Sequence, residues 1–146
     1  MLYKNSILAS LLISLGVIGL IVSNYSYFSM ILFSFGLFTI CVLNLNLFTG
    51  ICGFVIQRGN YIELLIILII NLISGYLIGY AYSYINPEYI TSATTVMTNW
   101  SISFSYFLKS VGCGIIMFLA VYLIKGAAKT NIGIFLGVPL FILCGF

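Results

Sequence analysis

The chain has 146 residues, of which 63% are hydrophobic and only 5% charged, with a formal net charge of +3 and no histidine. An average soluble domain is roughly 25% charged, so this composition excludes soluble and disordered proteins and predicts an all-α integral membrane protein. The lack of histidine excludes Ser-His-Asp and Cys-His catalysis and the usual zinc sites, and the weak, dispersed charge excludes nucleic-acid binding.

Five apolar segments are candidates for membrane spans within one transmembrane domain of residues 1–146. A helix needs about 20 mostly apolar residues to cross a 30 Å hydrocarbon core. The candidates cover about residues 7–22, 28–56, 62–82, 106–124 and 132–146. The first has no small-x-small cleavage site after it, so we expect an uncleaved span rather than a signal peptide. The fifth is short of a crossing, so we expect the chain to be part of something longer.

The basic residues predict the orientation of these spans. Four of the five fall on one side of the predicted membrane: Lys4, Arg58, Lys125 and Lys129. Basic residues mark the cytoplasmic side, so we expect a cytoplasmic N-terminus in a plasma or inner membrane, with Lys109 as the exception. The link over residues 85–105 then lies outside and carries Glu88, opposite Glu63. The two acids cannot form a catalytic pair, and we expect no enzyme activity.

The second span is interrupted near residues 44–50, which read NLNLFTG. Irregular backbone within a membrane is tolerated only when it is buried in protein or lines a cavity. One interpretation is a pair of half-helices joined by a loop, as in transporters and channels. The alternatives are two interfacial segments, or one kinked helix whose asparagine pairs with a neighbour.

Small residues and cysteines occur within these spans. Glycines at 16 and 19, at 75 and 79, and at 112 and 114 predict close helix packing. The four cysteines, at 41, 52, 113 and 144, form no CxxC pair and are interpreted as buried free thiols.

Three blocks of sequence resemble the formate/nitrite transporter family. Residues 33–37 (FSFGL) followed by 46–50 (NLFTG) resemble its broken second helix and loop. Residues 112–121 (GCGIIMFLAV) resemble its fourth-helix signature, and residues 139–146 (PLFILCGF) resemble the first half of its broken fifth helix. The resemblance covers nearly all of this chain and about the first two thirds of a family member.

The resemblance implies an aquaporin-like pentamer that passes small monovalent anions such as formate, nitrite or related weak acids. The residues themselves indicate no cofactor, and the lack of histidine argues against a metal. The resemblance also implies that Leu47, Phe48 and Thr49 form a loop facing the pore, with Thr49 offering a hydroxyl to an oxyanion. Two constrictions follow from the same resemblance, one cytoplasmic and one outer. The cytoplasmic one takes Leu37 and Leu47, and the outer one takes Phe33, Phe48 and Phe141. The alternative for each of these side chains is plain helix packing.

The chain departs from the family pattern at several positions. The central histidine that follows the fifth-helix G-F is absent, and we expect the end of the fifth helix and a sixth helix to be missing. Asn46 replaces the loop acid, and Gly114 replaces the fourth-helix asparagine. A small membrane protein with a structural or interaction role, or a non-functional fragment, therefore remains the alternative to a channel, and a membrane enzyme is the weakest hypothesis.

Overall fold

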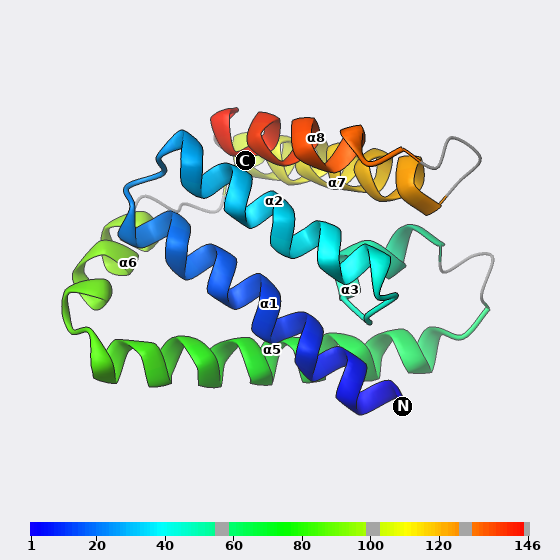
Figure 1. Cartoon of the computed structure of the whole chain (residues 1–146), viewed down its shortest axis with the longest axis horizontal. Helices are drawn as coiled ribbons and strands as arrows, with labels where there is room; N and C mark the ends of the chain where they lie inside the picture. The colour runs from blue at the N-terminus through cyan, green and yellow to red at the C-terminus, as the bar shows by residue number, and fades with distance from the viewer. Residues whose placement is uncertain (55–58, 99–102, 126–129, 145–146) are drawn as a thin grey trace.

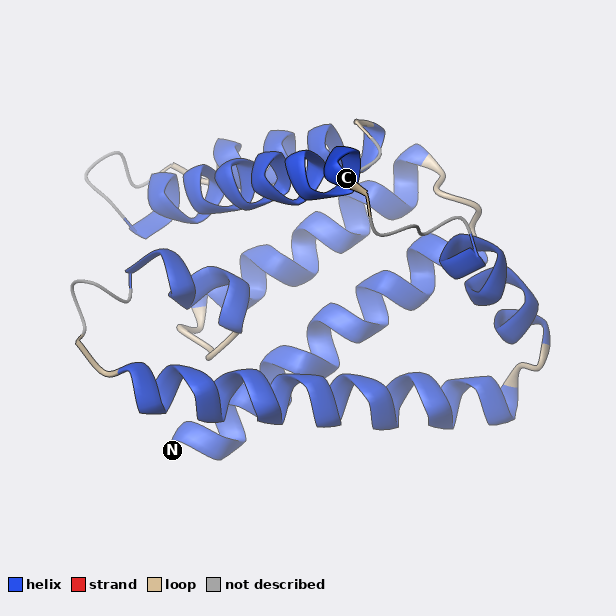
Figure 2. Cartoon of the chain, turned by 180° about the vertical axis from the view of Figure 1, so that it is seen from behind, coloured by secondary structure: helices blue, strands red, loops and turns tan. Residues whose placement is uncertain are grey.

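Every regular element in the described part of the chain is a helix (Figures 1 and 2). The structure is a computed structural model and describes residues 1–54, 59–98, 103–125 and 130–144. Its elements are α1 (Leu2–Val22), α2 (Tyr27–Val42), α3 (Phe48–Ile51), the 3-10 helix η1 (Cys52–Phe54), α5 (Tyr61–Ile85), α6 (Glu88–Thr98), α7 (Phe104–Lys125) and α8 (Ile132–Leu143).

Three of these helices are long and apolar enough to cross a membrane, which indicates a membrane-embedded protein. They are α1, α5 and α7, of 21, 25 and 22 residues. The predicted second span is divided into α2, α3 and η1, and the predicted fifth span contains α8, which has 12 residues. The sequence predicts a plain link over residues 85–105, but α6 occupies residues 88–98 of it.

Helix α2 lies at the centre of the arrangement, with α1 on one side and α8 on the other (Figure 1). Helix α7 packs against α8, and α5 packs against α1. The buried core joins residues of α1, α2, α7 and α8 with Leu45 and Leu47 from the connection after α2. The sequence therefore folds around α2, and the interrupted segment is part of the core rather than an appendage.

The outer faces of the helices are apolar and carry tyrosines near the helix ends. Only 6% of the most apolar 18-residue stretch of α5 is buried, and Leu65, Leu72 and Leu77 are exposed along it. Tyr61 and Tyr84 are exposed near its two ends, about 35 Å apart at 1.5 Å per residue. Exposed leucines between tyrosines at that spacing match a hydrocarbon core of about 30 Å with an aromatic belt at each interface.

The helix directions place the ends that carry Lys4 and Lys125 together. The first turn of α1, with Lys4, and the last turn of α7, with Lys125, lie at one end of the molecule (Figure 1). The beginning of α5, with Glu63, lies at the same end, whereas Glu88 begins α6 at the opposite end. Arg58 and Lys129, which the orientation prediction also used, lie outside the described residues.

Two glycines of α8 allow a close contact with α7. A Cβ at Gly133 would lie 3.3 Å from the backbone oxygen of Ala120, and one at Gly137 would lie 3.4 Å from the Ala120 Cβ. These two glycines form a GxxxG pair, in addition to the glycines that the sequence analysis above names. Of the glycines it named, positions 19, 79 and 114 have no neighbouring atom within 4 Å of such a Cβ, so they mark no tight crossing.

The four cysteines are free, as predicted, but their predicted burial is wrong for three of them. Cys41 is buried in the core, Cys52 and Cys113 are half-buried, and Cys144 is exposed. The prediction failed because apolar neighbours in a sequence do not distinguish a core-facing position from an outward-facing one in a membrane helix.

Candidate functional site

The interruption after α2 begins with a defined helix end at Asn44. This residue has a φ of 51°, in the left-handed region. Its N–H donates to the Cys41 carbonyl at 3.3 Å, and the N–H of Leu45 donates to the Ile40 carbonyl at 2.9 Å. This pair of bonds is a Schellman motif, in which asparagine is one of the residues that tolerates the left-handed position. Asn44 therefore ends α2 and turns Leu45 back into the core.

Asn71, from the middle of α5, holds the backbone after this turn. Its Oδ1 accepts the N–H of Phe48 at 2.8 Å, and its Nδ2 donates to the Asn46 carbonyl at 3.3 Å. These two backbone groups flank Leu47, which is extended with a φ of −99° and a ψ of 127°. In an extended chain such groups point to the same side, so the amide of Asn71 pairs with them as a neighbouring strand would.

The same amide also joins the interruption to α1. Nδ2 of Asn71 donates to the Ser6 carbonyl and to the Ser10 Oγ, each at 3.0 Å. Ser6 and Ser10 are buried and face α5 one turn apart. One uncharged side chain thus ties together α5, α1 and the connection between α2 and α3; we call this set of four hydrogen bonds the Asn71 clamp.

The clamp lies near the middle of the predicted membrane. Asn71 is ten residues beyond Tyr61, which places it about 15 Å along α5 and half of a 30 Å hydrocarbon core from the interface. At that depth an unsatisfied backbone N–H or C=O costs several kcal/mol. The clamp therefore supplies what an interrupted helix requires if its backbone is to persist away from water.

The segment formed by α3 and η1 packs against α7 through aromatic side chains and a glycine. The Phe54 ring lies 5.5 Å from that of Phe118 and 6.5 Å from that of Tyr122. Gly53 lies directly beneath Phe118, where any Cβ would overlap the ring. The short pair α3 and η1 is thus held between α5, through Asn71, and α7, through Phe54.

Four of the six predicted pore residues meet in one cluster. Phe33, Leu37 and Leu47 are buried in the core, and the partly buried Phe141 packs against them. The Phe33 and Phe141 rings, on α2 and α8, lie 6.3 Å apart in an edge-to-face arrangement. The cluster brings together the residues assigned to the cytoplasmic constriction and to the outer one.

The other two predicted residues differ from the expectation of a pore-facing loop. Phe48 and Thr49 form the first turn of α3, so of the three residues predicted to form the loop only Leu47 is extended chain. Phe48 is half-buried, and Thr49 is exposed. The helix begins early because Asn71 caps it: Oδ1 accepts the N–H of Phe48, one of the groups at a helix start that lack a partner within the helix.

Sequence reasoning missed Asn71, Ser6 and Ser10. A signal was present in the spacing of the two serines, which are four residues apart and therefore share one face of α1. A second signal was the lone amide in the long apolar run of α5, since polar side chains within membrane helices usually find a partner across the helix interface. Neither signal identifies residues 46–48 as the partner.

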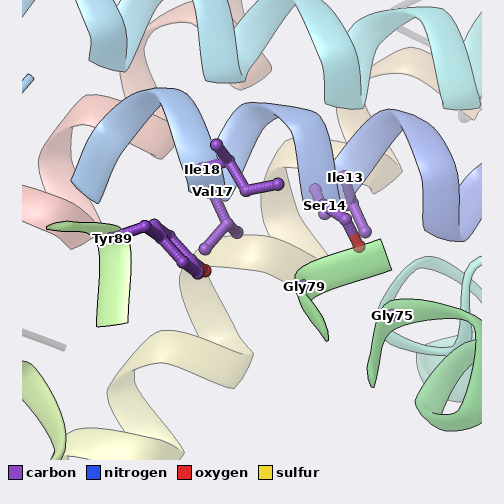
Figure 3. Close-up of a pocket in the computed structure, with 7 residues that line it drawn as sticks. All are labelled: Ile13, Ser14, Val17, Ile18, Gly75, Gly79 and Tyr89. Atoms are coloured by element: carbon purple, nitrogen blue, oxygen red, sulfur yellow. The ribbon is translucent and has the colours of Figure 1, made fainter. Parts of the chain in front are cut away.

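A separate apolar cavity of about 180 Å³ lies between α1, α5 and α6. Figure 3 shows its lining, in which Ile13, Ser14 and Val17 extend from α1 toward the glycines of α5. Tyr89 of α6 closes one end, and burial raises the pKa of its hydroxyl, with Tyr82 and Tyr25 acting in the same direction. Within the described ranges, no three His, Cys, Asp or Glu side chains gather as metal ligands would.

Comparison of the chain with protein-family models, with curated proteins and with solved structures finds no match in any of the three.

Proposed function

We propose that this chain passes small monovalent anions, or the corresponding neutral acids, across a membrane, along a path beside the interruption between α2 and α3. The observation that carries the proposal is the interruption itself, held near mid-membrane by the Asn71 clamp. Helices broken at that depth mark substrate paths in transporters. The blocks that resemble formate/nitrite transporters supply the substrate class and a homo-pentameric assembly, and the basic residues supply the cytoplasmic N-terminus.

The chemistry of the cluster favours an uncharged form of the substrate. The groups around Leu37 and Leu47 are apolar, and the groups that meet at Asn71 are amides, hydroxyls and backbone without a formal charge. An ion pays several kcal/mol to enter such surroundings even after relaxation, whereas a neutral acid pays far less. We therefore expect flux to follow the concentration of the protonated acid, with Thr49 offering a hydroxyl at the exposed side of α3.

Proteoliposomes containing the full chain test this function. We expect faster swelling, and a faster internal pH change, in gradients of formate, nitrite or lactate than in protein-free liposomes. Protein that reconstitutes and stays folded yet gives no flux for any of the three would overturn the proposal and favour a structural or interaction role.

Replacing Phe48 by alanine should raise this flux. The half-buried ring is removed, while the Phe48 N–H bond to Asn71 belongs to the backbone and is retained. Each 1.4 kcal/mol taken from a barrier is about tenfold in rate, so a severalfold rise needs only a modest widening. Phe35→Ala is the matched control because that ring is exposed on α2; flux that rises equally in both variants would remove Phe48 from the path.

A further inference from the structure

We propose that Asn71 is a positioning residue that sets the width and selectivity of the path by fixing the conformation of Leu47. This inference rests on the proposed transport function. Leu47 is 6% exposed and belongs to the buried cluster with Leu37 and Phe33. Its two flanking backbone groups, the Asn46 carbonyl and the Phe48 N–H, are both bonded to the one Asn71 amide. Asn71 itself is not part of that cluster.

The clamp fixes the position of Leu47 because the other backbone hydrogen bonds of residues 45–50 join only near neighbours in the sequence. The Leu47 N–H donates to the Leu45 carbonyl at 3.2 Å, and the Gly50 N–H donates to the Leu47 carbonyl at 3.1 Å. Such bonds shape the turn but do not attach it to another helix. The bonds to Asn71 cross 23 and 25 residues, so they fix where Leu47 stands relative to α5 and α1.

The amide is itself prevented from turning. Nδ2 is shared with the Ser6 carbonyl and the Ser10 Oγ on α1, so Oδ1 must face Phe48. A flipped amide would direct Oδ1 at two acceptor oxygens, the Ser6 and Asn46 carbonyls, and Nδ2 at the Phe48 N–H. The serines therefore select the one orientation that suits the backbone around Leu47.

The labelling rates of two native thiols test the positioning role of Asn71 without any measurement of transport. Cys52 is half-buried in η1, four residues beyond Phe48, and Cys113 is half-buried on α7. In single-cysteine versions of the full chain, Asn71→Leu should raise the rate of Cys52 labelling by a maleimide about three- to tenfold. That change corresponds to about 0.6 to 1.4 kcal/mol of lost hydrogen bonding. Cys113 labelling should stay as in the parent protein.

The transport readout is the ratio of lactate flux to formate flux. If Asn71→Leu only destabilises the fold, both fluxes should fall together. If it frees Leu47 from its fixed position, the bulkier lactate should pass more easily and the ratio should rise. Should Asn71→Leu not reconstitute, Asn71→Asp keeps the size and an acceptor for the Phe48 N–H. It offers at most one proton to three acceptors, and should give a smaller change of the same sign in labelling and ratio.

Ser10→Ala and Ser34→Ala form a matched pair. Both serines are buried and bond to the carbonyl four residues earlier, but only Ser10 also accepts from Asn71. Ser10→Ala should shift Cys52 labelling in the direction of Asn71→Leu, and Ser34→Ala should not.

The two proposals fail in different ways. Unchanged Cys52 labelling and an unchanged flux ratio in a transporting Asn71→Leu protein would overturn the positioning role alone. Absence of flux in the parent protein would overturn the transport function, and with it the role in selectivity, while Cys52 labelling would still show whether Asn71 holds the segment.

Discussion

Replacing Gly133 by leucine should force α8 away from α7 and sharply reduce the stability of the protein in detergent. A Cβ at this position would lie 2.7 Å from Leu123 Cδ1 and 3.1 Å from Leu123 Cβ, with the Ala120 backbone oxygen at 3.3 Å. The methyl end of Leu123 can turn aside, but the backbone of α7 cannot. Overpacking of this kind costs about 1–3 kcal/mol and occasionally more. Thermal unfolding followed by the loss of monodisperse protein measures the effect.

Gly79→Leu is the matched control for this prediction. It also replaces a glycine in an apolar helix, with Gly79 in the interior of the 25-residue α5 and Gly133 in the first turn of the 12-residue α8. A glycine in a helix interior costs about 1 kcal/mol of helix propensity, so Gly79→Leu should gain more from propensity than Gly133→Leu. No atom lies within 4 Å of a Cβ at position 79, and a leucine there meets open space rather than backbone. We expect Gly79→Leu to unfold at or above the temperature of the parent protein. A Gly133→Leu protein that is equally stable would show that the glycine contact does not limit how α7 and α8 pack.

The long membrane helices were predictable from their apolar runs, whereas the short polar helix α6 was not. Each of α1, α5 and α7 contains an 18-residue stretch of high mean hydropathy, which predicts a membrane span. α6 was missed because its sequence, EYITSATTVMT, is rich in β-branched residues that are weak helix formers. Pro87 and Glu88 are a helix start signal that the sequence does carry. In the folded chain α6 packs against α1 and α5.

The interruption was predictable in place but not in partners. Two asparagines, a threonine and a glycine within an apolar run indicated a break, and Asn44 does end α2. The early start of α3 at Phe48 depends on Asn71, which is 23 residues away in the sequence. Local propensity carries no information about which face of α5 meets that segment, so the clamp forms only when α1, α5 and the connection between α2 and α3 pack together.

The edge-to-face pair of Phe33 and Phe141 gives the second large prediction. Phe33 is 6% exposed and stands between α1 and α8, since a Cβ at Gly16 would lie 2.5 Å from its Cδ2. Phe33→Ala leaves a cavity beside Leu37, and such deletions cost about 3–5 kcal/mol in well-packed cores. If this ring forms the outer constriction, the same cavity extends the path. We expect formate flux per folded protein to rise about tenfold, the rate equivalent of about 1.4 kcal/mol.

A second ring pair between α2 and α8 serves as a control. It distinguishes the removal of a constriction in the path from a general loosening of the contact between the two helices. Phe38 of α2 and Phe135 of α8 lie 5.6 Å apart, and Phe38→Ala removes a contact of the same kind. Both variants should lose thermal stability, but only Phe33→Ala should raise flux. Phe141→Ala should reproduce Phe33→Ala, and the double variant should add little, because residues in contact share one effect. Equal flux in the Phe33 and Phe38 variants would mean that the rings hold α2 and α8 together and that no constriction lies between them.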